Sequence, residues 1–376
     1  MNSSLRFALE CAALLTLIAG CGQGDVLKDL EAGKAAYGIR DLAKANRLFE
    51  GCVKQSPDNV DALLYLARVK LELGELQAAR ERVRAAAALA PADADVLLLG
   101  AQVAWHAKDY TSAEKDFRAV AGNAAFPPAV RAEGWAGVGV VKMTGNDHHL
   151  ARLAFLRAIL ADRRNAAARY HLALLYRDAF DYKKLALEQM EIFQRLEVSA
   201  SPRMQKVQRT VIPALKEEIT RADADRPGVS RRNSGACAAL LAKAETSVRK
   251  SAFKEARRHY QEALEADPLS YPAALGLAKM WVKTDQGKSG QMKAFESYKT
   301  ACSLNESAIS AYLSAGMLAA KLGLHAQAVD IYSRAVAISP NSLDAIDGLI
   351  RALRKVGKAS VAEAYQDYRN SLGRKK

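Results

Sequence analysis

The chain has 376 residues, of which 50% are hydrophobic and 26% are charged, and its formal net charge is +14. This length and apolar content are ample for an extended hydrophobic core, and the absence of strand-like alternation excludes a sheet protein. Among the five cysteines, those at positions 52, 237 and 302 lie too far apart for a disulfide framework or a zinc motif.

The first twenty residues predict an export signal. Residues 11–20, with the sequence CAALLTLIAG, form a short apolar run, and a membrane-spanning helix needs about 20 apolar residues. We therefore interpret residues 1–20 as a signal peptide that is removed. The run ends in Ile18-Ala19-Gly20-Cys21, which resembles the cleavage box of bacterial lipoproteins. An ordinary signal peptide with a chance cysteine is the alternative.

The lipoprotein resemblance implies an anchor and a compartment. It makes Cys21 the first residue of the mature chain, carrying diacylglycerol and an N-acyl chain such as palmitate. Gly22, in place of an aspartate, favours the outer membrane, with the protein on its periplasmic face. Residues 21–25 are then a short tether.

Beyond the tether an alanine recurs every 34 residues. It stands at Ala45, Ala79 and Ala113, and again at Ala294, Ala328 and Ala362. In four copies a bulky residue follows four positions later, then a small residue, then a proline, as in Ala79, Val83, Ala86 and Pro91. A period of this length with helical spacing inside it predicts stacked helical hairpins.

One unit shows how a hairpin is encoded. Leu63, Leu66 and Val69 recur at intervals of three and four, which predicts one buried face of a helix over residues 61–73. Gly74 ends that helix because glycine adopts the left-handed conformation without penalty. A second helix is expected over residues 76–90, ended by Pro91, which cannot continue a helix.

The pattern resembles the tetratricopeptide repeat over most of residues 26–372. The residues that carry the resemblance are Gly74, Ala79, Ala86, Pro91, Gly100, Ala101, Tyr110, Ala113, Phe117, Gly316, Gly323, Ala328, Tyr332, Ala335 and Pro340. The resemblance implies an all-α solenoid of about eight to nine units that binds proteins. These residues are packing positions, so they do not identify a partner.

Departures from the period predict the organisation of the chain. Two intervals of 38, from Ala113 to Ala151 and from Ala256 to Ala294, predict loop-like insertions at 124–128 and 285–290. Residues 222–235 are rich in charge, proline and glycine and are predicted to link an N-terminal block, 26–221, to a C-terminal block, 236–376. The last unit carries Gln366 and Arg369 where apolar residues are expected, as in a capping helix.

Positive charge concentrates around the predicted linker. Residues 201–258 contain 14 Lys/Arg and 6 Asp/Glu. Such a basic junction suits anionic lipid or an acidic protein, although many of these charges are expected to be ordinary solvated helix faces. Nucleic acid is not expected as a partner of an exported chain. The later first helices add exposed cations at Lys279, Lys321, Arg351, Arg354 and Lys355.

The chain contains no catalytic motif: it has no glycine-rich phosphate loop, no HExxH and no Gly-x-Ser-x-Gly. We expect neither enzyme activity nor a cofactor or metal. Binding is the better hypothesis, because in the repeat family the first helices line a groove for a peptide or partner helix. Carried over by phase, the groove positions are Tyr37, Arg68, Gln102, Trp105, Val140, Met143, Tyr170 and Arg177.

These observations predict a lipid-anchored envelope scaffold that binds an extended peptide or helix of other proteins. By analogy of architecture, it would serve assembly of a pilus, a secretion system or an outer-membrane complex. The alternatives are an adaptor that docks or regulates peptidoglycan or protease enzymes, and an enzyme hidden on the scaffold.

Overall fold

The computed structural model describes residues 26–197, 202–226 and 232–373, and every regular element in these ranges is a helix. The signal peptide, Cys21 and the tether therefore lie outside the described residues. None of the described helices is long and apolar enough to cross a membrane.

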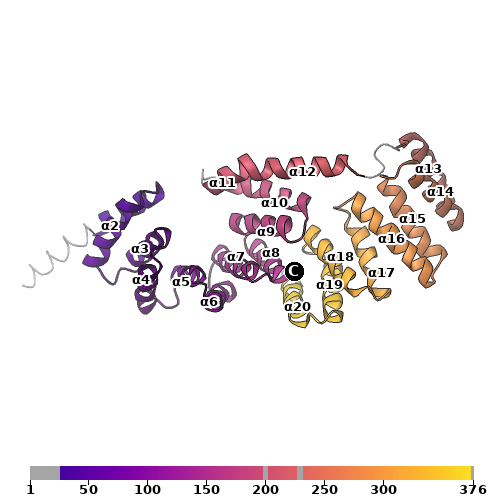
Figure 1. Cartoon of the computed structure of the whole chain (residues 1–376). Helices are drawn as coiled ribbons and strands as arrows, with labels where there is room; N and C mark the ends of the chain where they lie inside the picture. The colour runs from indigo at the N-terminus through magenta and orange to yellow at the C-terminus, as the bar shows by residue number, and fades with distance from the viewer. Residues whose placement is uncertain (1–25, 198–201, 227–231, 374–376) are drawn as a thin grey trace, which may run out of the picture. The chain divides into compact units, whose positions relative to one another are not determined.

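Nine successive helix pairs run along the described chain, which confirms the predicted all-α stack of about eight to nine units (Figure 1). The first five pairs are residues 26–38 with α2 (Leu42–Gln55), α3 (Val60–Glu72) with α4 (Leu76–Leu89), α5 (Ala94–His106) with α6 (Tyr110–Gly122), α7 (Pro128–Thr144) with α8 (His148–Ala161), and α9 (Ala166–Asp178) with α10 (Lys183–Leu196). The last four are α13 (Ser234–Arg249) with α14 (Phe253–Ala266), α15 (Tyr271–Thr284) with α16 (Lys288–Leu304), α17 (Ile309–Lys321) with α18 (His325–Ile338), and α19 (Leu343–Lys355) with α20 (Ala359–Gly373).

The described chain forms two compact units. The first unit contains residues 26–147 and Arg157–Ala168, and the second contains His148–Leu156 and the described residues from Arg169 onward. The linker predicted at 222–235 falls within the span of the second unit. The division into a block at 26–221 and a block at 236–376 therefore stays a prediction.

The recurring alanine is a point of close packing in each pair. All nine are 0% exposed, namely Ala45, Ala79, Ala113, Ala151, Ala186, Ala256, Ala294, Ala328 and Ala362. A methyl group lets two helix backbones approach, and the larger apolar side chains one turn away fill the space on either side.

A left-handed residue follows the first helix in eight of the nine described pairs. Glycine takes this place at Gly74, Gly323 and Gly357, with φ near +80°. In the other five, larger residues adopt the same conformation, namely Arg40, Lys108, Asn146, Asp181 and Ser251. The hairpin turn is therefore common to the repeats, although glycine marks it in only three.

The residues added at the two predicted insertions lengthen helices, and loops precede both of these helices. α7 and α16 have 17 residues each, whereas α3, α5 and α17 have 13 and α14 and α18 have 14. Pro128 begins α7, at the one helical position where a missing N–H costs nothing. Residues 124–127 and 285–287 do lie in loops, as expected, but the extra length itself is helical, since four residues add about one helical turn.

A further helical segment lies between the fifth and sixth pairs in the chain. It comprises α11 (Pro202–Lys206), a π-helical turn (Val207–Val211) and α12 (Ile212–Ala224), and it packs against α10. Pro213 cannot donate a backbone hydrogen bond and would clash with the preceding turn of an α-helix. The wider π turn directly before it accommodates the ring.

The C-terminal helix is joined to the start of the second unit by a buried arginine. Arg152 of α8 is 0% exposed, and its Nε and Nη2 atoms donate to the Tyr365 hydroxyl over 3.1 and 2.8 Å. Its Nη1 donates to the Ser333 carbonyl over 2.9 Å. The guanidinium also lies 5.0 Å from the ring centre of Phe180. α20 thus presents more than the predicted polar cap, because its tyrosine is part of the core.

Removing the hydroxyl of Tyr365 tests this joint. Tyr365→Phe leaves two N–H groups of a fully buried guanidinium without an acceptor, so we expect a loss of about 1–3 kcal/mol in the free energy of unfolding. Tyr176→Phe is the matched control, because Tyr176 is equally buried and its hydroxyl has no hydrogen-bond partner among the described residues. Denaturant unfolding should show no loss for Tyr176→Phe; equal losses for both would contradict the assigned role.

Two glycines test the close packing between helices. A Cβ atom at Gly348 of α19 would lie 2.3 Å from the Tyr332 ring of α18. We expect Gly348→Ala to destabilise the second unit by about 1–3 kcal/mol, since the ring must move.

The control is Gly51→Ala in α2, where nothing lies within 4 Å of the added methyl group. It should stabilise by up to about 1 kcal/mol through better helix propensity. Thermal and denaturant unfolding measure the stability of both variants. Unchanged stability of Gly348→Ala would show that the Tyr332 ring moves aside without cost and would contradict the prediction.

Candidate protein-binding surfaces

The predicted groove positions lie on first helices. Residues 26–38, α3, α5 and α7 provide six of them in the first unit, and α9 provides Tyr170 and Arg177 in the second. Gln102 is exposed, whereas the other seven are half-buried. The two groups belong to different units and are described separately.

Tyr37 is held by the neighbouring first helix. Its hydroxyl donates to a carboxylate oxygen of Glu72 over 2.6 Å, and Arg40 donates to the other oxygen over 2.9 Å. Burial, together with the bond to Glu72, raises the pKa of Tyr37 to about 12. The ring meets Tyr65 edge-on, with centroids 6.1 Å apart. Tyr37 is therefore a fixed, neutral aromatic side chain.

Arg68 occupies the same face one repeat later. Its Nη2 lies 3.4 Å from a carboxylate oxygen of Asp95, and its guanidinium lies 5.4 Å from the ring centre of Tyr65. Lys34 approaches the same ring at 5.4 Å. Tyr65, which the phase argument did not select, is thus the centre of this part of the surface.

Trp105 joins α5 to α7. Its indole Nε1 donates to the Thr144 hydroxyl over 3.3 Å, and its ring meets His106 edge-on at 4.9 Å. Val140 and Met143 are half-buried on the same helix as Thr144. The structure therefore brings an aromatic side chain to a contact between adjacent first helices.

In the second unit, the two predicted residues on α9 have local partners. The Tyr170 ring lies 5.3 Å from Phe193 of α10, and Arg177 pairs with the adjacent Asp178, with Nη2 3.0 Å from an oxygen. Tyr170 is therefore partly a packing residue, which distinguishes it from Trp105.

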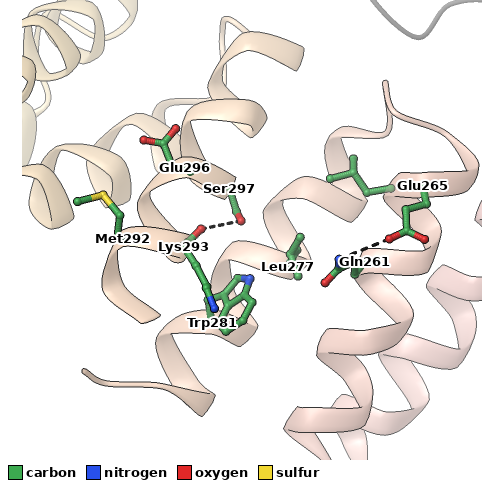
Figure 2. Close-up of a pocket in the computed structure, with 9 residues that line it drawn as sticks. Gln261, Glu265, Leu277, Trp281, Met292, Lys293, Glu296 and Ser297 are labelled. Carbon is green, nitrogen blue, oxygen red and sulfur yellow. Dashed lines mark hydrogen bonds between the residues drawn. The ribbon is translucent and has the colours of Figure 1, made fainter. Parts of the chain in front are cut away.

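The structure adds a cleft that the sequence did not predict. It has a volume of about 400 Å³ and lies between α14, α15 and α16. Its lining residues are Gln261, Leu264, Glu265, Leu277, Trp281, Met292, Lys293, Glu296 and Ser297. Figure 2 shows the Trp281 indole beside Lys293, with Gln261 and Glu265 on the helix across the cleft.

Two cations flank the indole in this cleft. The guanidinium of Arg257 lies 4.0 Å and the Nζ of Lys293 4.7 Å from the ring centre of Trp281. The repeat spacing places Trp281 in the first helix of its hairpin, where a buried position in the core is the simplest expectation. The two cations, one on α14 and one on α16, indicate instead that Trp281 contributes to a surface. They come close to the tryptophan only in the folded stack, so the sequence alone does not reveal them.

Two buried ionisable groups outside these surfaces have strongly shifted pKa values. Burial, with Arg152 and Lys358 nearby, lowers the pKa of His149 to about 3. Burial raises the pKa of the Cys302 thiol to about 12. In the ranges that the structure describes, no three side chains of His, Cys, Asp or Glu are grouped closely enough to hold a metal ion.

Comparison with known proteins identifies repeats of a known family in two segments of the chain. Residues 36–103 and residues 309–342 each match a family model described as tetratricopeptide repeat. The comparison with curated proteins found no match.

Several solved structures are similar over parts of the chain. PilF of Pseudomonas aeruginosa is 17% identical with a TM-score of 0.41, covering 55% of this chain and 95% of that one. A thermophilic tetratricopeptide protein of Thermus thermophilus is 20% identical with a TM-score of 0.43, covering 51% and 99%. A tetratricopeptide repeat protein from Parabacteroides merdae is 12% identical with a TM-score of 0.34, covering 88% and 99%.

The two matched segments share their pattern with the rest of the chain. The nine buried alanines and the nine helix pairs extend it from residue 26 to residue 373. The chain therefore carries tetratricopeptide repeats at residues 36–103 and 309–342, within an all-α solenoid whose other described hairpins follow the same pattern.

Proposed function

We propose that this protein is a lipid-anchored scaffold of the bacterial envelope that binds other proteins through its first helices. The observation that carries the proposal is the division of each first helix into two faces. One face is buried against its own hairpin, and the other presents partly exposed aromatic, aliphatic and cationic side chains such as Tyr37, Arg68 and Trp105.

This composition suits an extended peptide or a partner helix. Aromatic and arginine side chains contribute most of the binding energy in many protein interfaces, particularly where they are already held in place. Tyr37 is fixed by Glu72, and Trp105 by Thr144. A partner that covers these side chains would therefore lose little side-chain entropy on the scaffold's side.

The anchor is proposed from the sequence. Cys21, following the box Ile18-Ala19-Gly20, would carry the lipid, and the first described helix begins only five residues later, at Val26. Two or more acyl chains give stable membrane attachment, at about 0.8 kcal/mol for each buried methylene. The scaffold would then hold its partners close to the periplasmic face of the outer membrane.

Assembly of a pilus, a secretion system or an outer-membrane complex is the role that we favour for such a scaffold, by analogy of architecture. Crosslinked envelope, followed by purification of the protein, tests this role. Recovery of pilin or secretin subunits supports it. Recovery of peptidoglycan hydrolases or proteases instead would assign the protein to enzyme docking.

Truncating Trp105 tests the binding face. We expect Trp105→Ala to weaken partner capture about tenfold or more, because central aromatic residues often contribute about 2 kcal/mol or more to an interface. The matched control is Tyr110→Ala, which removes an exposed aromatic ring from the second helix α6 of the same unit.

Both Trp105→Ala and Tyr110→Ala should keep the helical circular-dichroism signal of the unmodified protein. Unchanged capture by Trp105→Ala, or an equal loss with Tyr110→Ala, would remove the first helices of this unit from the binding surface.

Replacing Cys21 tests the anchor. Without the acylated thiol, Cys21→Ser should move from the membrane fraction to the soluble periplasmic fraction, since no described helix can span a bilayer. The substitution Cys52→Ser, at a thiol buried in α2, serves as the control and should stay with the membrane. Retention of Cys21→Ser in washed membranes would refute the lipoprotein interpretation.

A further inference from the structure

Six cations lie on the first helices of the last three hairpins, and all six are exposed. They are Lys279 and Lys283 on α15, Lys321 on α17, and Arg351, Arg354 and Lys355 on α19. None of the six forms an ion pair with a described residue, and only Lys283 covers an aromatic ring, that of Phe253 at 4.3 Å. We call these six residues the basic face.

The basic face is in register from helix to helix. Lys283, Lys321 and Lys355 are each the thirteenth residue of their helix, and Lys279 and Arg351 are each the ninth of theirs. Residues nine, twelve and thirteen of an α-helix share one side. The cations therefore form two rows that run across the stacked helices.

Helix capping accounts for only part of this pattern. A cation in the last turn stabilises the negative end of the helix dipole, and four of the six cations stand in such a place, namely Lys283, Lys321, Arg354 and Lys355. Lys279 and Arg351, however, lie near the middle of their helices. Neither residue caps a helix. Arg351 hydrogen-bonds with the Tyr332 side chain, but this uncharged partner leaves its positive charge available to a ligand.

Opposing charge on these helices is small. α15 and α17 contain no acidic residue, and the two on α19 are Asp344 and Asp347 at its beginning. Asp347 is already paired with Arg369, whose Nε lies 2.7 Å from it. The first helices themselves therefore supply almost no negative charge to offset the basic face.

The junction singled out from the sequence behaves differently. There, five cations are paired within the second unit: Lys216 with Glu191, Arg221 with Glu217, Arg226 with Asp223, Arg232 with Asp267, and Arg258 with Glu262, at 2.7–3.5 Å. In each pair the carboxylate offsets the charge of its cation. These five junction cations therefore contribute less positive potential than the six cations of the basic face, which form no ion pair with a described residue.

Two apolar side chains lie among the cations. Met317 of α17, in the ninth position, is 58% exposed, and Val282 of α15, in the twelfth, is 39% exposed. A surface that mixes uncompensated cations with exposed aliphatic groups along a line fits a protein segment better than a lipid headgroup layer, which would meet the cations alone.

We propose that the basic face binds an extended, acidic segment of a partner protein. First helices that pack together, as α17 and α19 do, lie about 8–10 Å apart. An extended chain advances about 3.3 Å per residue, so the segment would carry Asp or Glu at about every third residue there. Apolar residues between them would contact Met317 and Val282. This inference rests on the proposed scaffold function and names the chemistry of one partner.

A synthetic peptide of about ten residues tests the pairing, with Glu at every third position and Leu or Ser between. Fluorescence anisotropy should show binding to the full chain that weakens as salt is raised, because the charges are exposed to solvent. The same peptide with Gln in place of Glu should bind about tenfold more weakly or worse. Equal binding of the two peptides, or none at all, would overturn the proposal.

Charge reversal locates the site. Lys279→Glu, Lys321→Glu and Lys355→Glu combined should weaken binding of the acidic peptide about tenfold or more. The matched control reverses three exposed lysines of the second helices, Lys254, Lys288 and Lys299, and should change the affinity by less than about twofold. An equal loss with the control would show attraction by net charge alone and would overturn the proposed site.

Two further readouts separate this inference from its alternatives. Sedimentation with vesicles that contain phosphatidylglycerol should give no binding that depends on the six cations; such binding, without peptide binding, would assign the basic face to lipid and overturn the proposal. In crosslinked envelope, unchanged capture of a partner by the charge-reversed protein would sink this inference alone, whereas no captured partner for the unmodified protein would sink the proposed function.

Discussion

Close approach between the helices at one alanine per repeat is the constraint on which the rest of the structure depends. Because each of these alanines is 0% exposed, a larger side chain there would separate two backbones and open the hairpin. The packing uses the inner faces of all the helices. What remains for recognition is the outer side of the first helices and the clefts between hairpins, and all the candidate surfaces are found there.

The same constraint explains why the fold was predictable and some of its details were not. A period of 34 residues fixes the number of hairpins and the buried positions. An interval of 38 shows only that residues were added. Since four residues make about one α-helical turn, the added turn leaves the helix faces in phase. Val140 and Met143 stand four positions later in the lengthened α7 than Gln102 and Trp105 do in α5, and therefore lie on the equivalent side of the helix.

The repeat period does not predict contacts between side chains that are far apart in the sequence. Arg152 directly follows a core alanine, and nothing local indicates that it is buried, because its acceptor, Tyr365, is 213 residues away. A guanidinium without a carboxylate is tolerated there because a hydroxyl, a carbonyl and two aromatic faces surround it. Likewise, Trp281 has its cations on two other helices, and phase alone would place the residue in the core.

The net charge counted from the sequence differs from the charge that remains after ion pairing, and the pairs likewise depend on tertiary structure. The sequence locates an excess of cations around residues 201–258, where several of them pair with carboxylates within the same helix or on other segments. The first helices of the last hairpins hold fewer cations, but almost no acid lies near them. An acidic partner responds to the potential that remains after internal pairing. Internal pairing therefore lowers the charge that the junction offers to a partner, whereas the six cations of the basic face form no ion pair with a described residue.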